Sequence, residues 1–262
     1  MGLLDGKTGL IVGIANERSY AWFIAQSIIA QGGTCAFTHL PGEKNERRTR
    51  RAVEALGVTD PWLHPLDASS DEDMDKAFSA YAEAHGQKMH FLVHSIAFAD
   101  REWLQIGNFH KTPRKAYLDA IDISSYTLAA MASRAKDMMI NAGGGSVLAM
   151  SYYGSEKVVP GYNIMGVAKA ALETTSRYLA SELGQHNIRV NTISGGYLRT
   201  LASSAVGGAE EISKHNLERA PLRRNVEGGD VGGVAAFLVS DLANGVTGEN
   251  IYVDCGVNIV GV

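Results

Sequence analysis

The chain has 262 residues, of which 45% are hydrophobic and 20% charged, and its formal net charge is −4. These values are those of a globular protein with a substantial core, and they exclude the strongly basic surface that binds nucleic acid or an anionic membrane. With two well-separated cysteines we expect no disulfide framework and no metal site, and the lack of a signal-peptide pattern or a long apolar run predicts a cytoplasmic location.

Short apolar runs alternate with helical patterns along the whole chain. The runs that predict strands are Thr8–Val12, Thr34–Thr38, Trp62–Leu66, His90–His94, Ser146–Met150, Ile188–Ser194 and Asn250–Val253. Helices are predicted from about residue 20 to 31, from about residue 70, and over Pro113–Asn141, Gly161–Gln185 and Val226–Ser240. A polar, basic segment through Arg51 precedes a short helix up to Leu56, and the stretch before about His215 is irregular. This alternation predicts one α/β domain over residues 1–262, with helices on both faces of a doubly wound, seven-stranded parallel sheet.

The residues directly after the strands form the candidate site, because ligands of such sheets bind beyond the carboxyl ends of the strands. After the first strand, Gly13 and the helix start near Ser19 suit a pyrophosphate, although the turn lacks the G-x-G-x-x-G pattern. After the second strand, Leu40 is neither the acidic residue that suits NAD nor the basic residue that suits NADP. Asp67 suits an adenine amine or a helix cap, and Ser95-Ile96-Ala97 suit the wall of a flat ligand or plain packing.

A tyrosine and a lysine follow the fifth strand. Tyr162 and Lys169 are seven residues apart in a predicted helix, so that their side chains share one face. A nearby ammonium favours phenolate-like character, and the phenol can then donate a hydrogen bond or a proton to an oxygen that gains negative charge. Such pairs are more often ordinary surface or packing residues. The functional interpretation therefore depends on the strand-end residues around the pair.

Taken together, these segments resemble the short-chain dehydrogenase/reductase superfamily, and within it the bacterial enoyl-[acyl-carrier-protein] reductases, over essentially the whole chain. The resemblance is carried by GIANERSYAWFIA, HSIAFA, DISSY, SYYGSEKVVPGYNIMGVAKAALE and GENIYVDCG. Most of the superfamily has Tyr-x3-Lys, which would require a tyrosine at Met165, whereas Tyr162-x6-Lys169 is the enoyl reductase spacing. The alternatives are a carbonyl reductase or alcohol dehydrogenase of the same superfamily and a catalytically silent nucleotide-binding homologue.

The resemblance implies a Rossmann-type homotetramer that reduces trans-2-enoyl thioesters with NADH in the elongation cycle of fatty acid synthesis, with acyl carrier protein as the substrate carrier. Of the catalytic group, Tyr162 would hydrogen-bond the thioester oxygen, Lys169 would hold the nicotinamide ribose and Tyr152 would line the substrate site, where Ala99 would face the acyl chain. The residues that would surround the cofactor are Gly13, Ala15, Ser19, Tyr20, Leu40, Asp67, Ala68, Ser95, Ile96, Ala97, Lys169, Leu198, Arg199, Thr200, Leu201 and Ala202.

Three places depart from the family pattern. Phe23 stands where a small residue lets the first helix pack closely on the sheet, so that its ring needs space made for it. Tyr197 replaces a proline and frees the backbone at the start of the expected substrate-binding lid, residues 197–215. Leu40-Pro41 lack the basic pair of NADP-using members, which favours NADH. The residues that keep NADPH as an alternative are Lys44, Arg47 and Arg48.

Overall fold

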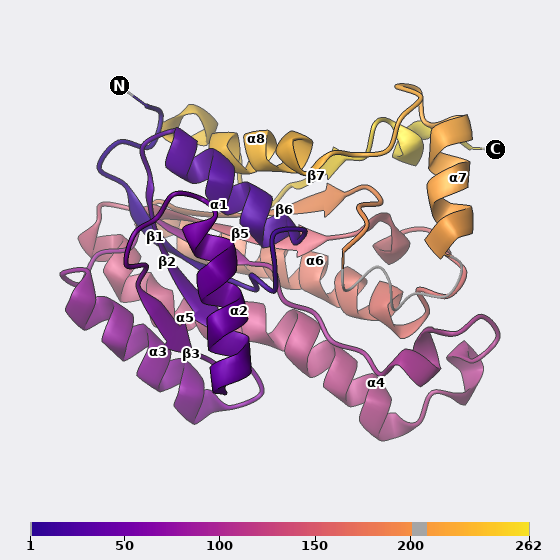
Figure 1. Cartoon of the computed structure of the whole chain (residues 1–262), viewed down its shortest axis with the longest axis horizontal. Coiled ribbons are helices and arrows are strands. Elements are labelled where there is room, and N and C mark those ends of the chain that lie inside the picture. Colours follow the sequence, from indigo (N-terminus) through magenta and orange to yellow (C-terminus); the bar gives the residue numbers. More distant parts are fainter. Residues whose placement is uncertain (1, 201–208, 262) are drawn as a thin grey trace.

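The computed structural model describes residues 2–200 and 209–261, and its centre is one sheet of seven parallel strands (Figure 1). The strands are β1 (Thr8–Val12), β2 (Thr34–His39), β3 (Leu63–Pro65), β4 (Phe91–His94), β5 (Gly145–Ser151), β6 (Ile188–Gly195) and β7 (Asn250–Val253). Their order is β3-β2-β1-β4-β5-β6-β7. Successive strands are thus added to one side of β1 up to β3, and to its other side from β4 onward, so that the strand order reverses between β1 and β4. The predicted doubly wound sheet is confirmed, and the strand boundaries differ from the predicted ones by no more than one residue at either end.

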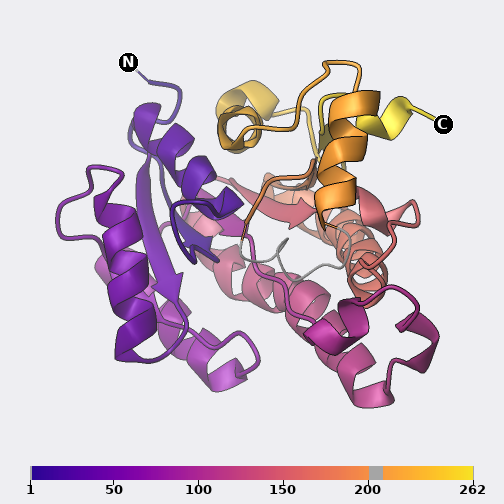
Figure 2. The same cartoon turned by 45° about the vertical axis from the view of Figure 1, so that its right-hand side comes forward.

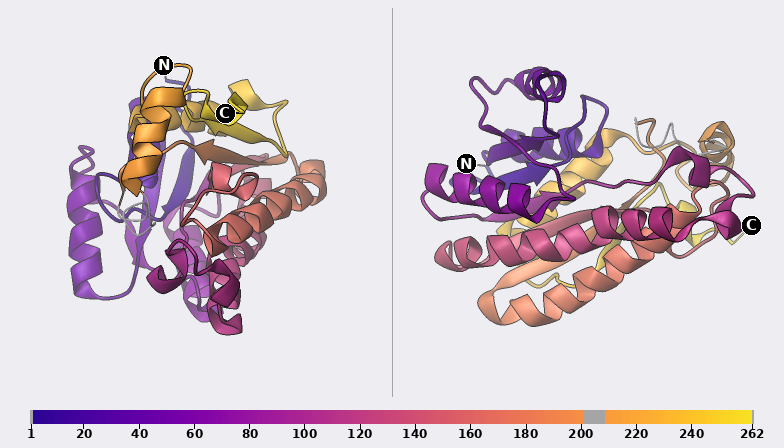
Figure 3. Two further views of the ribbon diagram at one scale, coloured as in Figure 1. Left: turned by 90° about the vertical axis from the view of Figure 1, so that its right-hand side faces the viewer. Right: turned by 90° about the horizontal axis from the view of Figure 1, so that it is seen from below.

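Helices cover both faces of this sheet, and Figures 2 and 3 show the layers from further sides. The helices are α1 (Tyr20–Ala30), α2 (Glu43–Glu54), α3 (Asp71–Ala84), α4 (Arg114–Ile121), α5 (Thr127–Asn141), α6 (Ile164–Leu183), α7 (Ala209–Arg219) and α8 (Gly228–Val239). On β1, Ile11 faces the core under α1, α2 and α8, whereas Leu10 and Val12 face the core under α3, α5 and α6. Burial on both faces explains why the strands read as continuous apolar runs.

Several predicted segments have a different structure. The short helix predicted after Arg51 is the end of a longer one, because α2 already begins at Glu43. The helix predicted over Pro113–Asn141 is divided into α4, a π-helical turn at Asp122–Tyr126 and α5. In the π turn, Ser124 Oγ accepts a hydrogen bond from the Phe98 N–H (3.0 Å) and donates one to the Phe98 carbonyl (3.3 Å), a tertiary contact that helical periodicity cannot reveal. The stretch up to His215 is not irregular throughout, because α7 begins at Ala209.

The helix predicted over Gly161–Gln185 begins only at Ile164. Positive φ angles at Gly161 (83°) and Asn163 (45°) form a turn before it, and Asn163 Nδ2 donates hydrogen bonds to the carbonyls of Trp103 (2.9 Å) and Gln105 (2.8 Å). Tyr162 therefore lies in this turn and not on α6, so the prediction that it shares a helix face with Lys169 is wrong.

The structure also bears on the two cysteines and on the hydropathy of the helices. Cys35 and Cys255 are both free and buried, in agreement with the expectation that they form no disulfide framework. Within residues 2–200 and 209–261, no helix combines the length and the apolar character that spanning a membrane requires.

The phenyl ring of Phe23 packs against α8 at a position where that helix has a glycine instead of a side chain. A Cβ atom built on Gly228, the first residue of α8, would stand 2.1 Å from the Phe23 ring, and one built on Gly232 would stand 2.5 Å from the Phe23 carbonyl oxygen. The adjacent Ile24 stays fully buried. The two glycines of α8 thus let α1 and α8 pack closely while α1 keeps its contact with the sheet.

We expect Gly228→Ala to destabilise the protein, because the new methyl group would overlap the Phe23 ring. Overpacking of this kind typically costs about 1–3 kcal/mol, which lowers the melting temperature of a domain of this size by roughly 2–10 °C. The matched control is Gly229→Ala at the next residue of α8, where an added Cβ has open space. Thermal unfolding followed by circular dichroism measures both variants, and equal melting temperatures would contradict the packing described for Phe23.

Candidate active site at the carboxyl edge of the sheet

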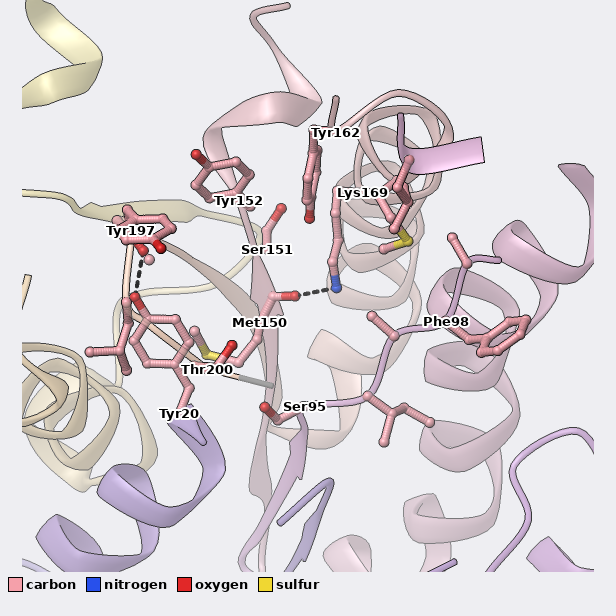
Figure 4. A pocket seen from close by; sticks show the side chains of 18 residues that line it. Tyr20, Ser95, Phe98, Met150, Ser151, Tyr152, Tyr162, Lys169, Tyr197 and Thr200 are labelled. Carbon is pink, nitrogen blue, oxygen red and sulfur yellow. Dashed lines mark hydrogen bonds between the residues drawn. The ribbon is translucent and has the colours of Figure 1, made fainter. Parts of the chain in front are cut away.

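Two cavities adjoin beyond the carboxyl ends of the strands. The first, called the tyrosine cavity here, has a volume of about 260 Å³ and is lined by Tyr20, Tyr152, Tyr162 and Tyr197 among others (Figure 4). The second, the long cavity, has a volume of about 620 Å³ and extends past β1 and β2. Tyr20, Thr200 and the segment Ser95–Phe98 line both cavities. The site lies where the strand order reverses, which is where open parallel sheets bind ligands.

The long cavity brings together most of the residues predicted to surround a cofactor. Those that line it are Gly13, Ala15, Ser19, Tyr20, Leu40, Asp67, Ala68, Ser95, Ile96, Ala97 and Thr200. Leu198 and Lys169 line the tyrosine cavity instead, and Arg199 lines neither of the two. Leu201 and Ala202 lie outside the described residues, as does part of the predicted lid.

The turn after β1 depends on a glycine. Gly13 has a φ of 112°, and a Cβ atom on it would stand 2.2 Å from the Ser95 carbonyl oxygen. The following helix, α1, lacks a side-chain cap, because the Ser19 hydroxyl donates to the Asn16 carbonyl (2.7 Å). The first N–H groups of α1 therefore remain available at the edge of the long cavity, the arrangement in which helix N-termini bind phosphate groups.

The far end of the long cavity carries its charged side chains. Among the described lining residues, only Asp67 and Arg48 carry a formal charge. Asp67 Oδ1 accepts hydrogen bonds from the Ser69 N–H (2.9 Å) and hydroxyl (2.7 Å), while Ser70 accepts from the Asp73 N–H and caps α3. Asp67 is therefore not the helix cap, the alternative considered for it. Leu40, which is 59% exposed, and Arg48 both line this cavity.

In the tyrosine cavity, the rings of Tyr152 and Tyr162 contact each other edge to face, with 4.7 Å between their centroids (Figure 4). Tyr152 directly follows β5, and Tyr162 comes from the turn before α6. The Tyr162 ring packs against Gly154, where a side chain would not fit, because a Cβ atom there would stand 2.4 Å from the ring. Lys169 extends from α6 into the same cavity and donates a hydrogen bond to the Met150 carbonyl (2.7 Å). The site thus brings together the three residues predicted as the catalytic group.

Burial controls the protonation of these groups. It raises the pKa of Tyr162 well above the usual value, and the neighbouring Tyr152 and Glu173 act in the same direction. Burial likewise raises the pKa of Tyr152 to about 12 and lowers the pKa of Lys169 to about 8. The raised pKa of Tyr162 does not support its predicted phenolate-like character, because burial, Tyr152 and Glu173 all favour the protonated hydroxyl. Tyr162 is instead a protonated hydroxyl, a hydrogen-bond donor in an apolar cavity.

Several residues that line the two cavities were not predicted as site residues from the sequence. Asn45 and Thr49 reach the long cavity from α2, where the Thr49 hydroxyl donates to the Ile14 carbonyl (3.2 Å). Leu104 and Met165 line the tyrosine cavity from helical elements that begin well after β4 and β5 have ended. A search limited to strand ends finds none of these residues. Thr49 lies in the segment predicted as polar and basic, and its burial on α2 becomes visible only in the structure.

Known proteins match this chain over nearly its whole length. The model of the family described as Enoyl-(Acyl carrier protein) reductase matches residues 13–258. The chain belongs to this family. In agreement, an enoyl-[acyl-carrier-protein] reductase [NADH] FabI of Synechocystis sp. is 47% identical over 260 residues, which cover 98% of each chain, and one of Bacillus cereus is 46% identical with full coverage of both.

Solved structures of enoyl-acyl carrier protein reductases have the same fold. The Bacillus cereus reductase with NADP+ and indole naphthyridinone has a TM-score of 0.95 at 45% identity, covering all of both chains. The reductase of Anaplasma phagocytophilum in complex with NAD has a TM-score of 0.93 at 45% identity, covering 100% of this chain and 97% of the other. The resemblance to the enoyl reductases and the Rossmann-type fold that it implied are confirmed. The two solved structures hold the nicotinamide cofactors NADP+ and NAD.

Proposed function

We propose that this chain is an NADH-dependent enoyl-[acyl-carrier-protein] reductase that reduces trans-2-enoyl thioesters in fatty acid elongation. The observation that carries the proposal is the convergence of Tyr162 and Lys169, separated by the enoyl reductase spacing, on one largely apolar cavity that adjoins the long cavity. Met165, at the position where a carbonyl reductase of this superfamily would need its tyrosine, also lines this cavity.

The long cavity suits a nicotinamide dinucleotide. At Gly13 the backbone leaves room that a Cβ atom would remove, and the uncapped start of α1 offers N–H groups to a pyrophosphate. Asp67 and Ala68 would contact the adenine, and Ile96 would lie beside the nicotinamide. Lys169, with its pKa lowered to about 8 by burial, would hold the nicotinamide ribose through a charge-assisted hydrogen bond.

The side chains of the tyrosine cavity fit enoyl reduction. When bound, the reduced nicotinamide supplies the hydride that adds to the β-carbon of the enoyl thioester. Negative charge then develops on the thioester oxygen, to which the Tyr162 hydroxyl would donate a hydrogen bond. Because the cavity is lined mainly by apolar side chains, this hydrogen bond is stronger in the transition state than it would be in water. Tyr152 would support the Tyr162 ring, and Ala99 would face the acyl chain.

Acyl carrier protein as substrate carrier and a homotetrameric assembly complete the proposal. Large side chains are exposed on α4, in the π turn and on α6, which supports an interface between copies: Tyr117 and Leu118 on α4, Tyr126 in the π turn and Tyr178 on α6. Light scattering of the purified protein measures the number of chains. The lid over residues 197–215, and within it the roles of Leu198, Arg199, Thr200, Leu201 and Ala202, stay predictions.

The test of the proposed reaction is NADH oxidation, followed by its absorbance, with crotonyl or 2-decenoyl thioesters. We expect turnover with the thioesters and none with simple ketones. Turnover of ketones alone would indicate the carbonyl reductase alternative. Tight binding of NADH by the folded protein without turnover of either substrate would indicate a silent nucleotide-binding homologue.

The guanidinium of Arg48 is expected to let the enzyme use NADPH as a second cofactor. Arg48 lines the long cavity, as Leu40 does, and makes no ion pair among the described residues, so that a 2′-phosphate would supply it with a partner. Arg48→Ala should lower kcat/KM for NADPH about three- to tenfold and leave that for NADH nearly unchanged. The control is Arg47→Ala, an exposed neighbour on α2 that does not line the cavity. Equal losses with both cofactors would contradict this role.

A further inference from the structure

Two buried charged side chains lie one helical turn apart on the side of α6 that faces β5. Lys169 is 5% exposed and Glu173 is 6% exposed. Residues four apart share a helix face, and these two contact consecutive residues at the end of β5. Lys169 Nζ donates a hydrogen bond to the Met150 carbonyl (2.7 Å), and the Ser151 hydroxyl donates one to the Glu173 carboxylate. The same two residues of β5 therefore fix both charges, directly before Tyr152.

Burying an ammonium without compensation is costly, and the Met150 carbonyl is the hydrogen-bond partner that the structure gives Lys169. No carboxylate lies within ion-pair distance of Lys169 among the described residues. The buried Glu173 carboxylate, held by Ser151 one turn along α6, is an opposite charge that accompanies it into the interior. Because Glu173 is itself buried, its charge acts on Lys169 from within the protein interior, at the position that Ser151 fixes.

Three titratable groups near this pair, each on a different part of the chain, are uncharged near neutral pH. On β4, His94 has a pKa lowered to about 3 by burial and by the Lys169 cation, so that it is neutral. In the turn before α6, the pKa of Tyr162 is raised by burial, and on β7 the pKa of Tyr252 is raised by burial as well. Burial lowers the pKa of Lys169 to about 8, and the charge of Glu173 opposes that change.

We propose that Glu173 is a positioning residue for the reduction: its carboxylate, fixed by Ser151, keeps the Lys169 ammonium charged where that ammonium holds the nicotinamide ribose. The proposal rests on the role given to Lys169 under the proposed function. Glu173 acts through Lys169 and through the end of β5 that both side chains contact.

The test is the affinity for NADH as a function of pH, measured by fluorescence titration between about pH 6 and about pH 10. In the wild type, affinity should be highest while Lys169 is protonated and fall as the pH rises through about 8. In Glu173→Gln, which keeps an acceptor for Ser151 but loses the charge, the fall should begin about one pH unit lower. At pH values between the two midpoints and just above them, the variant should bind NADH up to about tenfold more weakly, and at the acid end both should bind equally.

Further variants separate charge from structure. Ser151→Ala retains the carboxylate but removes the hydrogen bond that fixes it, and should lower the midpoint less than Glu173→Gln does. The double variant Ser151→Ala with Glu173→Met replaces the buried polar pair by apolar groups of similar size, which proteins tolerate well, and should reproduce the lower midpoint. Lys169→Met should remove the pH dependence.

Two results would overturn the proposal: an unchanged midpoint in Glu173→Gln and in the double variant, or a loss of affinity that is equal at every pH, as a merely structural role predicts. A wild-type affinity that does not fall with pH would exclude Lys169 from cofactor binding and the proposal with it. Because the readout is NADH binding, failure to turn over enoyl thioesters is a separate result that concerns the proposed reaction alone.

Discussion

Tyr162→Phe is expected to lower kcat/KM for a 2-enoyl thioester about 100- to 1000-fold, with little change in the affinity for NADH. The hydroxyl that this change removes is a buried, protonated donor in the tyrosine cavity, because burial raises the pKa of Tyr162. Removing a donor that acts on charge developing in the transition state lowers the rate of the chemical step more than binding. Steady-state kinetics and NADH fluorescence measure the two effects separately.

The matched control for this variant is Tyr153→Phe. Tyr153 is close in the sequence, but its ring packs beside Tyr252 at 6.4 Å and does not line the tyrosine cavity. We expect it to retain near wild-type rates. Equal activity of the Tyr162 and Tyr153 variants would show that the phenol in the cavity takes no part in the reaction.

Lys169→Met is expected to weaken NADH binding about 10- to 100-fold, because a charge-assisted hydrogen bond to the ribose is lost. Methionine has a similar length, so that the packing of α6 on β5 is preserved. Turnover at saturating NADH should fall less than the affinity does. Fluorescence titration together with kinetics over a range of NADH concentrations tests this, and unchanged affinity would remove Lys169 from the cofactor site.

Strand-end residues were the predictable part of the site. Gly13, Asp67 and the segment Ser95–Ala97 each directly follow an apolar run, and the edge of a parallel sheet brings such positions together whatever the helices between them do. For the same reason the strands were predictable to within one residue, since burial on both faces leaves an unbroken apolar signal.

What could not be predicted depends on contacts between distant segments. The turn that holds Tyr162 follows from the positive φ at Asn163, whose side chain bonds to backbone near Trp103, and no periodicity shows this. The sequence showed no sign of room for the Phe23 ring, because the glycine that makes this room, Gly228, lies far along the chain on α8. The protonation of Tyr162 likewise depends on burial, which the spacing to Lys169 does not encode.

The central claim is that hydride transfer takes place to the β-carbon of an enoyl thioester held beside Tyr162. Incubation with NADH deuterated at the transferable position and 2-decenoyl thioester, followed by NMR of the product, locates the label directly. We expect a saturated thioester with deuterium on its β-carbon. Deuterium on a carbinol carbon formed from a ketone, with the enoyl thioester left unchanged, would contradict it.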